Sequence, residues 1–508
     1  MIKPLLIRYL ILIGLIILIV IFFFFSSPQK PSEPPRPKTP KPESPILENP
    51  DLRKAEFEDI HFPENFFFGT ASSDFQTTGG TGTTDWNLYI QECLAKKRDC
   101  VDKDILNNSP DAVFVGPEVG TDFLNRYKED FDLAPGITQV HRLSLEWSRI
   151  EPEEGKWDKD AIRNYKEIFR YMKSKGIEPM ICLNHFALPL WFVEKGDWEN
   201  IESAKYYARY AEKVASEIGI PLNIKWWLTF NEPQVILGQS YVKGSWPPYK
   251  SIQGYQDAAG TKRLALVVNN MMEGHRQSYR AIHKIMGKNT MVGFASAPGS
   301  FYPNDPNSKL DQLAVNSYNF ISALLFDFTI GTSDRDFVGV NYYGRSLLKL
   351  HASLAYNILP WLNEEKPFAI QWVPFMQNQL VQRPKEFYPK GLYDLIMQYK
   401  DLGLPIIVTE NGIHDPSDQF REEFVVIHLK SVHDAIKDGA NVIGYQYWAL
   451  TDTWEWNGFF SQMGLIGIDR DDGLKRVLRP SAKTYVDIIE TKTIKKELLE
   501  KYKELIAH

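Results

Sequence analysis

The 508-residue sequence lacks the clusters of cysteine and histidine that metal centres require. No His-x-His pair and no Cys cluster occurs, which argues against a zinc-type site, and we expect neither a metal nor a cofactor. There are three cysteines. Cys93 and Cys100 flank a short charged loop, where a disulfide and two free thiols are equally compatible with the sequence. Cys182 lies in an apolar run and is expected to be inert core.

Excess positive charge and glycine-rich loops are also lacking. The net charge of −6 provides no basic surface for nucleic acid, so we expect no such partner. No glycine-rich phosphate loop follows any apolar run, which argues against an open dinucleotide-binding sheet. Neither an internal repeat nor a second linker is visible between residues 60 and 490, which indicates one large domain.

The amino terminus contains a long apolar run. Residues 5–25 are apolar except for Arg8 and Tyr9, which is long enough to span a bilayer. Residues 9–25 carry no charge. Lys3 and Arg8 precede this uncharged part and favour a cytoplasmic amino terminus, although basic residues also follow it. A cleaved signal peptide is the alternative, but "FFFFSSPQ" contains no small-x-small cleavage site. We therefore predict a single-pass anchor over residues 1–26 and an extracytoplasmic catalytic domain.

Segments of different character flank the expected domain, which covers residues 57–488. Residues 27–56 are rich in proline and predict a semi-rigid polyproline spacer. Residues 489–508 carry an apolar stripe backed by lysines and predict a carboxyl-terminal amphipathic helix. We expect this helix to pack on the domain rather than to contact a membrane or a partner.

Short apolar runs alternate with longer amphipathic stretches throughout the domain. Eight such runs predict a single closed (β/α)₈ TIM barrel of the α/β class, with an open doubly wound sheet as the alternative. The predicted strands lie within residues 65–72, 138–148, 178–185, 225–232, 291–296, 336–343, 405–412 and 441–450.

Polar residues stand at or just beyond the carboxyl ends of these runs. Each one alone could be a solvent-facing strand cap, but in a barrel these ends converge on the face where active sites are built. The residues are Arg142, Asn184, His185, Asn231, Glu232, Asn341, Glu410, Asn411 and Glu455.

Two of these carboxylates form a candidate pair. Glu232 ends the fourth run and Glu410 ends the seventh, so the barrel would place them across its mouth. Glycoside hydrolysis needs such a pair, in which one carboxyl group attacks the anomeric carbon and the other exchanges a proton. Metal ligation is the competing interpretation, and it is weakened by the missing Cys and His clusters.

The sequence resembles glycoside hydrolase family 1, the β-glucosidase-like retaining enzymes, over roughly residues 57–488. The matching motifs occur in the family's order, and "TFNEP" followed by "TENG" is highly specific. They are "FFFGTASSDFQ", "RLSLEWSRIEPEEG", "LNHFALPLWF", "TFNEP", "DFVGVNYYGR", "YPKGLYDL", "VTENG" and "YQYWALTDTWEW".

The resemblance implies a role for each matching residue. Glu232 would be the general acid/base and Glu410 the nucleophile, supported by Arg142, Asn231, Asn341 and Tyr343. Asn231 would hold the sugar 2-hydroxyl, while Tyr343 and Arg142 would keep Glu410 ionised. The residues that would bind the sugar are Gln76, His185, Asn231, Trp448, Glu455 and Trp456.

Departures from the family pattern put specificity in doubt while leaving the chemistry intact. The usual Glu two residues after the glycone Gln is Thr78, and the family's "RFG" is replaced by residues 462–464. Residues 345–387, which should wall the aglycone side, match nothing that we can align.

Three functions remain open at this point. The first is a membrane-anchored retaining exo-β-glycosidase that hydrolyses β-glucosides or β-galactosides. "HFALPLW", "YVKGSWPP" and "TDTWEW" are also similar to the plant membrane-bound branch that moves galactose between galactolipids, so the second is transfer of a sugar onto a lipid or glycan acceptor. The third is a sugar-binding module without catalysis. The partner would be a small-molecule glycoside or glycolipid, and the sequence does not indicate an oligomeric state.

Overall fold

The computed structural model describes residues 57–97, 100, 113–252, 257–323, 326–327, 329–348, 387–456 and 458–506. The predicted anchor (1–26), the predicted linker (27–56) and most of the unaligned stretch 345–387 lie outside these residues. Within the described ranges, no helix combines the length and apolar character that crossing a bilayer needs.

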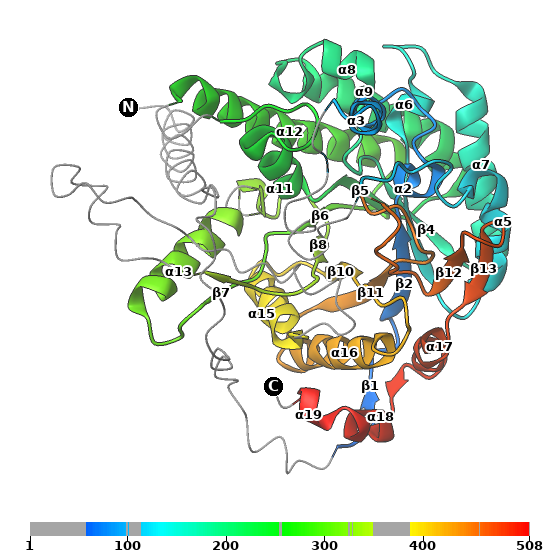
Figure 1. Cartoon of the computed structure of the whole chain (residues 1–508), viewed down its shortest axis with the longest axis vertical. Coiled ribbons are helices and arrows are strands. Elements are labelled where there is room, and N and C mark those ends of the chain that lie inside the picture. Colours follow the sequence, from blue (N-terminus) through cyan, green and yellow to red (C-terminus); the bar gives the residue numbers. More distant parts are fainter. Residues whose placement is uncertain are drawn as a thin grey trace.

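Eight parallel strands close into a barrel, and each lies within one of the predicted runs (Figure 1). The last barrel strand pairs with the first, Tyr445 opposite Phe68, which closes the sheet and excludes the open alternative. The predicted (β/α)₈ barrel is therefore confirmed. The strands are β2 (Phe67–Ser72), β3 (Val140–Ser144), β4 (Glu178–Cys182), β5 (Trp226–Asn231), β6 (Met291–Ser296), β8 (Val338–Asn341), β10 (Ile406–Asn411) and β11 (Val442–Trp448).

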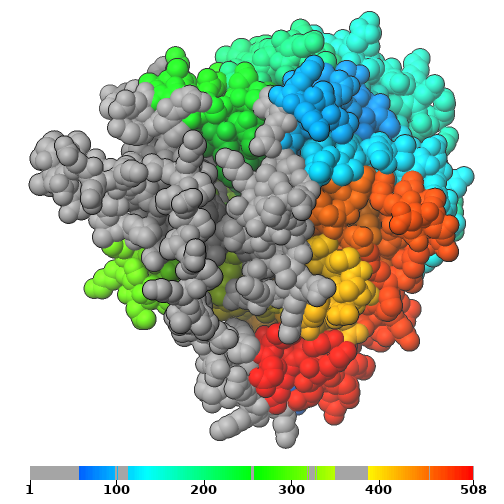
Figure 2. Space-filling model, viewed as in Figure 1, coloured from blue at the N-terminus to red at the C-terminus, as the bar shows by residue number. Residues whose placement is uncertain are grey.

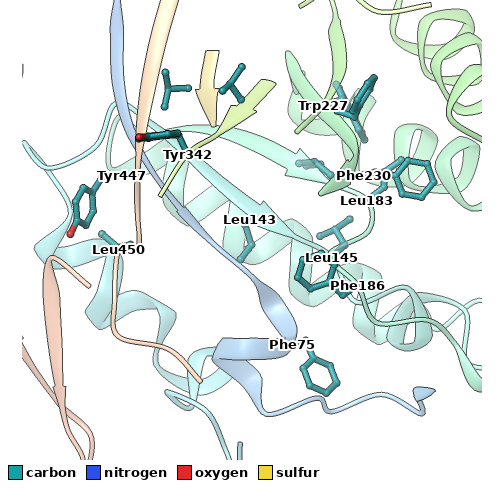
Figure 3. Packing of buried hydrophobic residues seen from close by; sticks show 14 of the residues in the cluster. Phe75, Leu143, Leu145, Leu183, Phe186, Trp227, Phe230, Tyr342, Tyr447 and Leu450 are labelled. Carbon is teal, nitrogen blue, oxygen red and sulfur yellow. The ribbon is translucent and has the colours of Figure 1, made fainter. Parts of the chain in front are cut away.

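The strands are buried on both faces, which explains why they read as continuous apolar runs. One core fills the barrel and includes Met180, Leu228 and Ile407. A larger core lies between the strands and the surrounding helices, and Figure 3 shows part of it, including Trp227 and Phe230 of β5. Cys182 is a fully buried thiol inside the barrel, and burial raises its pKa to about 12, as expected for an inert core residue.

Helices surround the barrel in the outer layer (Figure 1). Asp158 illustrates how they begin, because its carboxylate accepts bonds from the Asp160 and Ala161 amides at 2.8 and 2.9 Å and caps α7. The longer helices are α3 (Asp85–Leu94), α5 (Phe123–Leu133), α7 (Lys159–Ser174), α9 (Ser203–Val214), α12 (Ala258–Met286), α13 (Lys309–Ala323), α15 (Pro389–Lys400), α16 (Arg421–Lys437) and α17 (Ser481–Thr491).

Shorter elements connect the strands and helices. Two π-helical turns occur: Ala215–Gly219 follows α9, and Leu237–Lys243 follows α11 (Pro233–Ile236). The short helices are α2 (Asp74–Thr78), α6 (Trp147–Ile150), α8 (Leu190–Glu194), η2 (Asp197–Glu199), α10 (Ile220–Leu222) and α11 (Pro233–Ile236). The short strand pairs are β7 (Phe301–Pro303) with β9 (Ser346–Leu348), and β12 (Ile466–Asp469) with β13 (Lys475–Leu478).

The carboxyl-terminal segment is not the single helix predicted over residues 489–508. Helix α17 ends at Thr491, because Lys492 adopts a left-handed backbone with φ 49°. The next residues form β14 (Thr493–Ile494), which pairs antiparallel with β1 (Ile60–His61), and two short helices follow, α18 (Lys496–Lys501) and α19 (Lys503–Ile506). The segment covers the bottom of the domain in Figure 2. Ile494 and Leu499 are fully buried, so the apolar stripe packs on the domain as expected.

Cys93 and Cys100 form a disulfide, which decides between the two states that the sequence left open. Cys93 lies in the last turn of α3 and Cys100 lies seven residues further along the chain.

Candidate active site

The carboxyl ends of the barrel strands bring the candidate residues together at one mouth. Arg142 points from β3, Asn231 ends β5, Asn341 ends β8, Glu410 lies on β10 and Trp448 ends β11. All five are buried. These five residues therefore meet at the barrel mouth rather than forming separate surface caps.

Glu410 is held between a cation and a hydroxyl group. The Arg142 guanidinium forms a buried ion pair with Glu410 Oε1. The Tyr343 hydroxyl donates a hydrogen bond of 2.5 Å to Oε2. Burial and the charge of Glu410 hold the pKa of Tyr343 well above its ordinary value, so the hydroxyl keeps the proton that it donates. Both carboxylate oxygens thus have a partner, one a cation and the other a hydroxyl donor.

Glu232 stands in a different environment. Its backbone adopts a left-handed conformation (φ 47°, ψ 59°) at the turn from β5 into α11, and Pro233 begins that helix. Such conformations are costly for a residue with a side chain and cluster at functional sites. Glu232 Oε1 accepts a hydrogen bond from Asn341 Nδ2 at 2.8 Å. Burial raises the pKa of Glu232 to about 8, and the negative charge of Glu410 adds to the effect.

Two amides connect these carboxyl groups. Asn231 Oδ1 accepts from Arg142 Nη1 at 2.7 Å and from Asn341 Nδ2 at 3.1 Å. Asn341 is oriented by Thr409, whose hydroxyl donates to Asn341 Oδ1 at 2.7 Å. This contact points the Asn341 amide hydrogens toward Asn231 and Glu232. Sequence reasoning missed Thr409, although its place directly before Glu410 in an otherwise apolar strand marks it as unusual.

Aromatic and polar side chains continue the site beyond this cluster and form a wall that consists of Gln76, His185, Trp448, Glu455 and Trp456. The His185 ring stacks on Trp448 and Trp456 with centroids 5.6 and 6.0 Å apart, and its Nε2 lies 3.4 Å from Asn231 Nδ2. Trp448 Nε1 donates to Glu455 Oε1 at 3.2 Å. His185, Trp448, Glu455 and Trp456 are thus joined to Asn231 in one set of contacts. The side chains of two other candidates bind elsewhere: Asn184 Nδ2 donates to the Ala187 carbonyl at 2.9 Å, and Asn411 Nδ2 donates to the Tyr342 carbonyl at 2.7 Å.

Two polar atoms in this wall lack a hydrogen-bond partner within the described part of the chain, although both are buried. They are Gln76 Oε1 and His185 Nδ1. Burial, with the charge of Arg142, lowers the pKa of His185 well below its ordinary value, so the imidazole is neutral. Because unsatisfied buried polar atoms are costly, these two indicate where hydroxyl groups of a ligand would bind.

Glu455 is the third carboxyl group of the site. Burial raises the pKa of Glu455 to about 8, and this effect outweighs the hydrogen bonds from Thr453 and Trp448, which lower the pKa. Thr453 Oγ1 donates to Glu455 Oε1 at 2.9 Å and accepts from Gln76 Nε2 at 3.5 Å. Thr453 therefore links Gln76 to Glu455, a role that could have been suspected from its place between Trp448 and Trp454 in "YWALTDTWEW". No three His, Cys, Asp or Glu side chains of the described residues are grouped as a metal site requires.

Comparison with known proteins gives consistent matches along the domain. The sequence model of glycosyl hydrolase family 1 matches residues 58–330 and 327–494. A β-galactosidase of Saccharolobus solfataricus is 29% identical over 86% of this chain and 96% of that protein. The solved β-glycosidase from Pyrococcus horikoshii is 30% identical with a TM-score of 0.69, covering 88% of this chain and 98% of that one.

One further relative is named for a different activity. The chloroplastic galactolipid galactosyltransferase of Arabidopsis thaliana is 29% identical over 70% of this chain and 55% of that protein.

Proposed function

The chain belongs to glycosyl hydrolase family 1 and is a glycoside hydrolase, and from this premise we propose that it is a retaining exo-β-glycosidase acting on β-glucosides or β-galactosides. The observation that carries the proposal is the contrast between its two carboxyl groups. Glu410 is paired with Arg142 and Tyr343, whereas burial raises the pKa of Glu232 to about 8. A nucleophile must be ionised and a general acid must be protonated, which is what these two environments favour.

The reaction would proceed by double displacement. Glu410 attacks the anomeric carbon while Glu232 protonates the leaving oxygen, which gives a covalent glycosyl-enzyme. Glu232, now ionised, then takes a proton from water as the water attacks, and Glu410 leaves. Asn231, fixed by Arg142 and Asn341, would hold the sugar 2-hydroxyl, an interaction that strengthens in the transition state.

The unpartnered atoms of the wall would bind the glycone. Gln76 Oε1 can accept from a sugar hydroxyl. The neutral His185 faces the Asn231 amide nitrogen with Nε2, so its Nδ1 carries the hydrogen and can donate to a second hydroxyl. Glu455 would bind a further hydroxyl beside Trp448. The indole of Trp448 or Trp456 would stack on the C–H face of the ring. Amide, imidazole and carboxyl groups together discriminate the orientation of hydroxyl groups.

The proposal is tested with nitrophenyl β-glucoside, β-galactoside, β-mannoside and β-fucoside, following the anomeric configuration of the first product by NMR. We expect the glucoside or the galactoside to be hydrolysed fastest and the β-anomer to be released first. Release of the α-anomer first would contradict the retaining mechanism, and preference for the mannoside would contradict the substrate class.

A second candidate function is transfer of the sugar to a lipid or glycan acceptor. The similarity to the Arabidopsis galactosyltransferase favours it, because the same glycosyl-enzyme can react with a sugar hydroxyl instead of water. Incubation with a galactolipid in vesicles distinguishes the two. Hydrolysis predicts free galactose alone, whereas transfer predicts di- and oligogalactolipids at the expense of free sugar.

We also propose that residues 1–26 anchor the protein in a membrane with the catalytic domain outside the cytoplasm. The apolar run supports this, and an extracytoplasmic location agrees with the disulfide between Cys93 and Cys100. The full-length protein should sediment with membranes, resist extraction by carbonate and be cleaved by protease added to intact cells. Release into the soluble fraction by carbonate would contradict the anchor.

A further inference from the structure

Helix α2 carries Gln76 between two side chains that contact each other. Asp74 and Thr78 are four residues apart and so share one face of the helix. Thr78 Oγ1 donates to Asp74 Oδ1 at 3.2 Å, and both residues are buried. Position 78 is where the family resemblance places a glutamate. In this chain position 78 is a threonine, and the carboxylate on that face of α2 belongs to Asp74, one turn earlier.

The Asp74 carboxylate connects α2 to two other elements. The hydroxyl of Tyr165 on α7 donates to Asp74 Oδ2 at 2.8 Å, and Nη1 of Arg149 on α6 lies 3.6 Å from the same oxygen. Arg149 Nη1 also donates to the Tyr165 hydroxyl at 3.1 Å. The backbone amide of Asp74 donates to Ser144 Oγ at the end of β3. A buried carboxylate is costly unless it is paired and hydrogen-bonded, and these donors supply both.

Gln76 is fixed from the other side. Its Nε2 donates to the Trp454 carbonyl at 2.9 Å, and its Oε1 lacks a partner within the described part of the chain. A helix of five residues has little stability of its own, so its position depends on such external contacts. The direction of Gln76 Oε1 is therefore set by how α2 is held at Asp74 and at Trp454.

We propose that Asp74 is a positioning residue for the glycone pocket, which acts through Gln76 by tying α2 to Arg149 and Tyr165, and that it replaces a carboxylate at position 78. The inference rests on the proposed function, because it takes Gln76 to contact the sugar. It assigns to Asp74 no contact with the substrate.

A double-mutant cycle between positions 74 and 76 tests the proposal, with the nitrophenyl glycoside that the protein cleaves best and its 3-deoxy and 4-deoxy analogues. Asp74→Asn keeps the shape of the side chain and removes its charge. We expect kcat/KM to fall by about 10- to 100-fold in the wild-type background, since small misplacements of a positioning group have effects of this size. In the Gln76→Ala background the same change should alter kcat/KM less than about twofold, because coupled residues are not additive.

The deoxy analogues separate positioning from a loss of stability. The wild type should cleave one of the two analogues more slowly than the parent glycoside, because that analogue lacks the hydroxyl that Gln76 binds. Asp74→Asn should lower kcat/KM least for this analogue, since its cleavage no longer depends on where Gln76 lies. Asp197→Asn is the control, because the surroundings of Asp197 match those of Asp74. Asp197 is also buried, its Oδ1 accepts a hydrogen bond from the Tyr241 hydroxyl at 2.8 Å, and its Oδ2 lies 3.7 Å from Lys250 Nζ. It should lower the melting temperature without changing the ratio of rates between analogues.

Moving the carboxylate is the second test. Asp74→Ser combined with Thr78→Glu should recover kcat/KM to within about threefold of the wild type, whereas Asp74→Ser alone should not. If Asp74→Asn does not fold, Tyr165→Phe replaces it in the cycle. This substitution removes the hydrogen bond from the Tyr165 hydroxyl to Asp74 and keeps the charges of Asp74 and Arg149. If the effects of the substitutions at positions 74 and 76 on kcat/KM are additive, the inference about Asp74 is overturned while the proposed function stands. Unchanged kinetics in Gln76→Ala would overturn the glycone assignment of the proposed function and the inference with it.

Discussion

Replacing Glu410 with glycine is expected to lower kcat/KM by roughly 10⁴-fold or more, the scale seen when a catalytic nucleophile is removed. The change removes the only carboxylate that Arg142 and Tyr343 both contact in the described site, and it leaves a space where the proposed nucleophile stood. Arg142 is fully buried and would lose its anionic partner, so a small anion should bind there.

Added azide should restore cleavage of an activated glycoside in Glu410→Gly. Azide would attack from the face that Glu410 occupied, and no second displacement follows, so the product should be the α-glycosyl azide with inverted configuration. NMR of the product identifies it. Glu455→Gly is the control, because it removes a nearby carboxyl group that is not proposed to attack, and azide should give no inverted product. Full activity of Glu410→Gly without azide would exclude Glu410 as the nucleophile.

Replacing Glu232 with alanine should have an effect that depends on the leaving group. Protonation by a general acid contributes about 10²- to 10⁴-fold, and it matters most for leaving groups that are poor without a proton. Alkyl glycosides should therefore lose rate by that factor, while formation of the glycosyl-enzyme from a dinitrophenyl glycoside should change little. Azide should again accelerate the reaction, but the product should be the β-azide, because Glu410 still performs the first displacement. An equal loss with both leaving groups would contradict the assignment.

The pH dependence gives an independent measurement of the same group. Glu232 must be protonated to act as an acid, and burial together with the charge of Glu410 raises its pKa to about 8. Raising the pH through this value removes the proton, so kcat/KM of the wild type should fall above about pH 8. The decline should be measured with an alkyl glycoside, whose departure needs the acid, and the residual activity of Glu232→Ala on the same substrate should lack it. If the decline persists in Glu232→Ala, then Glu455, whose pKa burial also raises to about 8, is the group that sets it.

The barrel could be predicted because each strand carries its own signal. Ile406, Ile407 and Val408 are all fully buried, so β10 reads as an unbroken apolar run that ends abruptly at Thr409 and Glu410. The polar residues at the strand ends also identified the site, since the fold brings the same end of every strand to one mouth.

The elements that could not be predicted depend on contacts distant in sequence. The apolar stripe after residue 489 fits a helix, yet Thr493 and Ile494 form a strand because β1 offers them a partner more than 400 residues away. The π-helical turn Leu237–Lys243 departs from the 3.6-residue period that sequence patterns report. Asp74 and Thr409 were missed for a related reason, because their importance lies in the hydrogen bonds that they make to other elements.

The pairing of β1 with β14 determines how the domain carries mechanical load. Phe57 N lies 3.3 Å from Glu500 Oε1, and Phe62 N donates to the Lys492 carbonyl at 2.8 Å, so the first described residues are fastened to the last ones. A pulling force applied through the residues that precede Phe57 reaches β1 before it reaches the barrel strand β2. Until β1 and β14 separate, their pairing carries part of that force into the carboxyl-terminal segment instead of along the chain into β2.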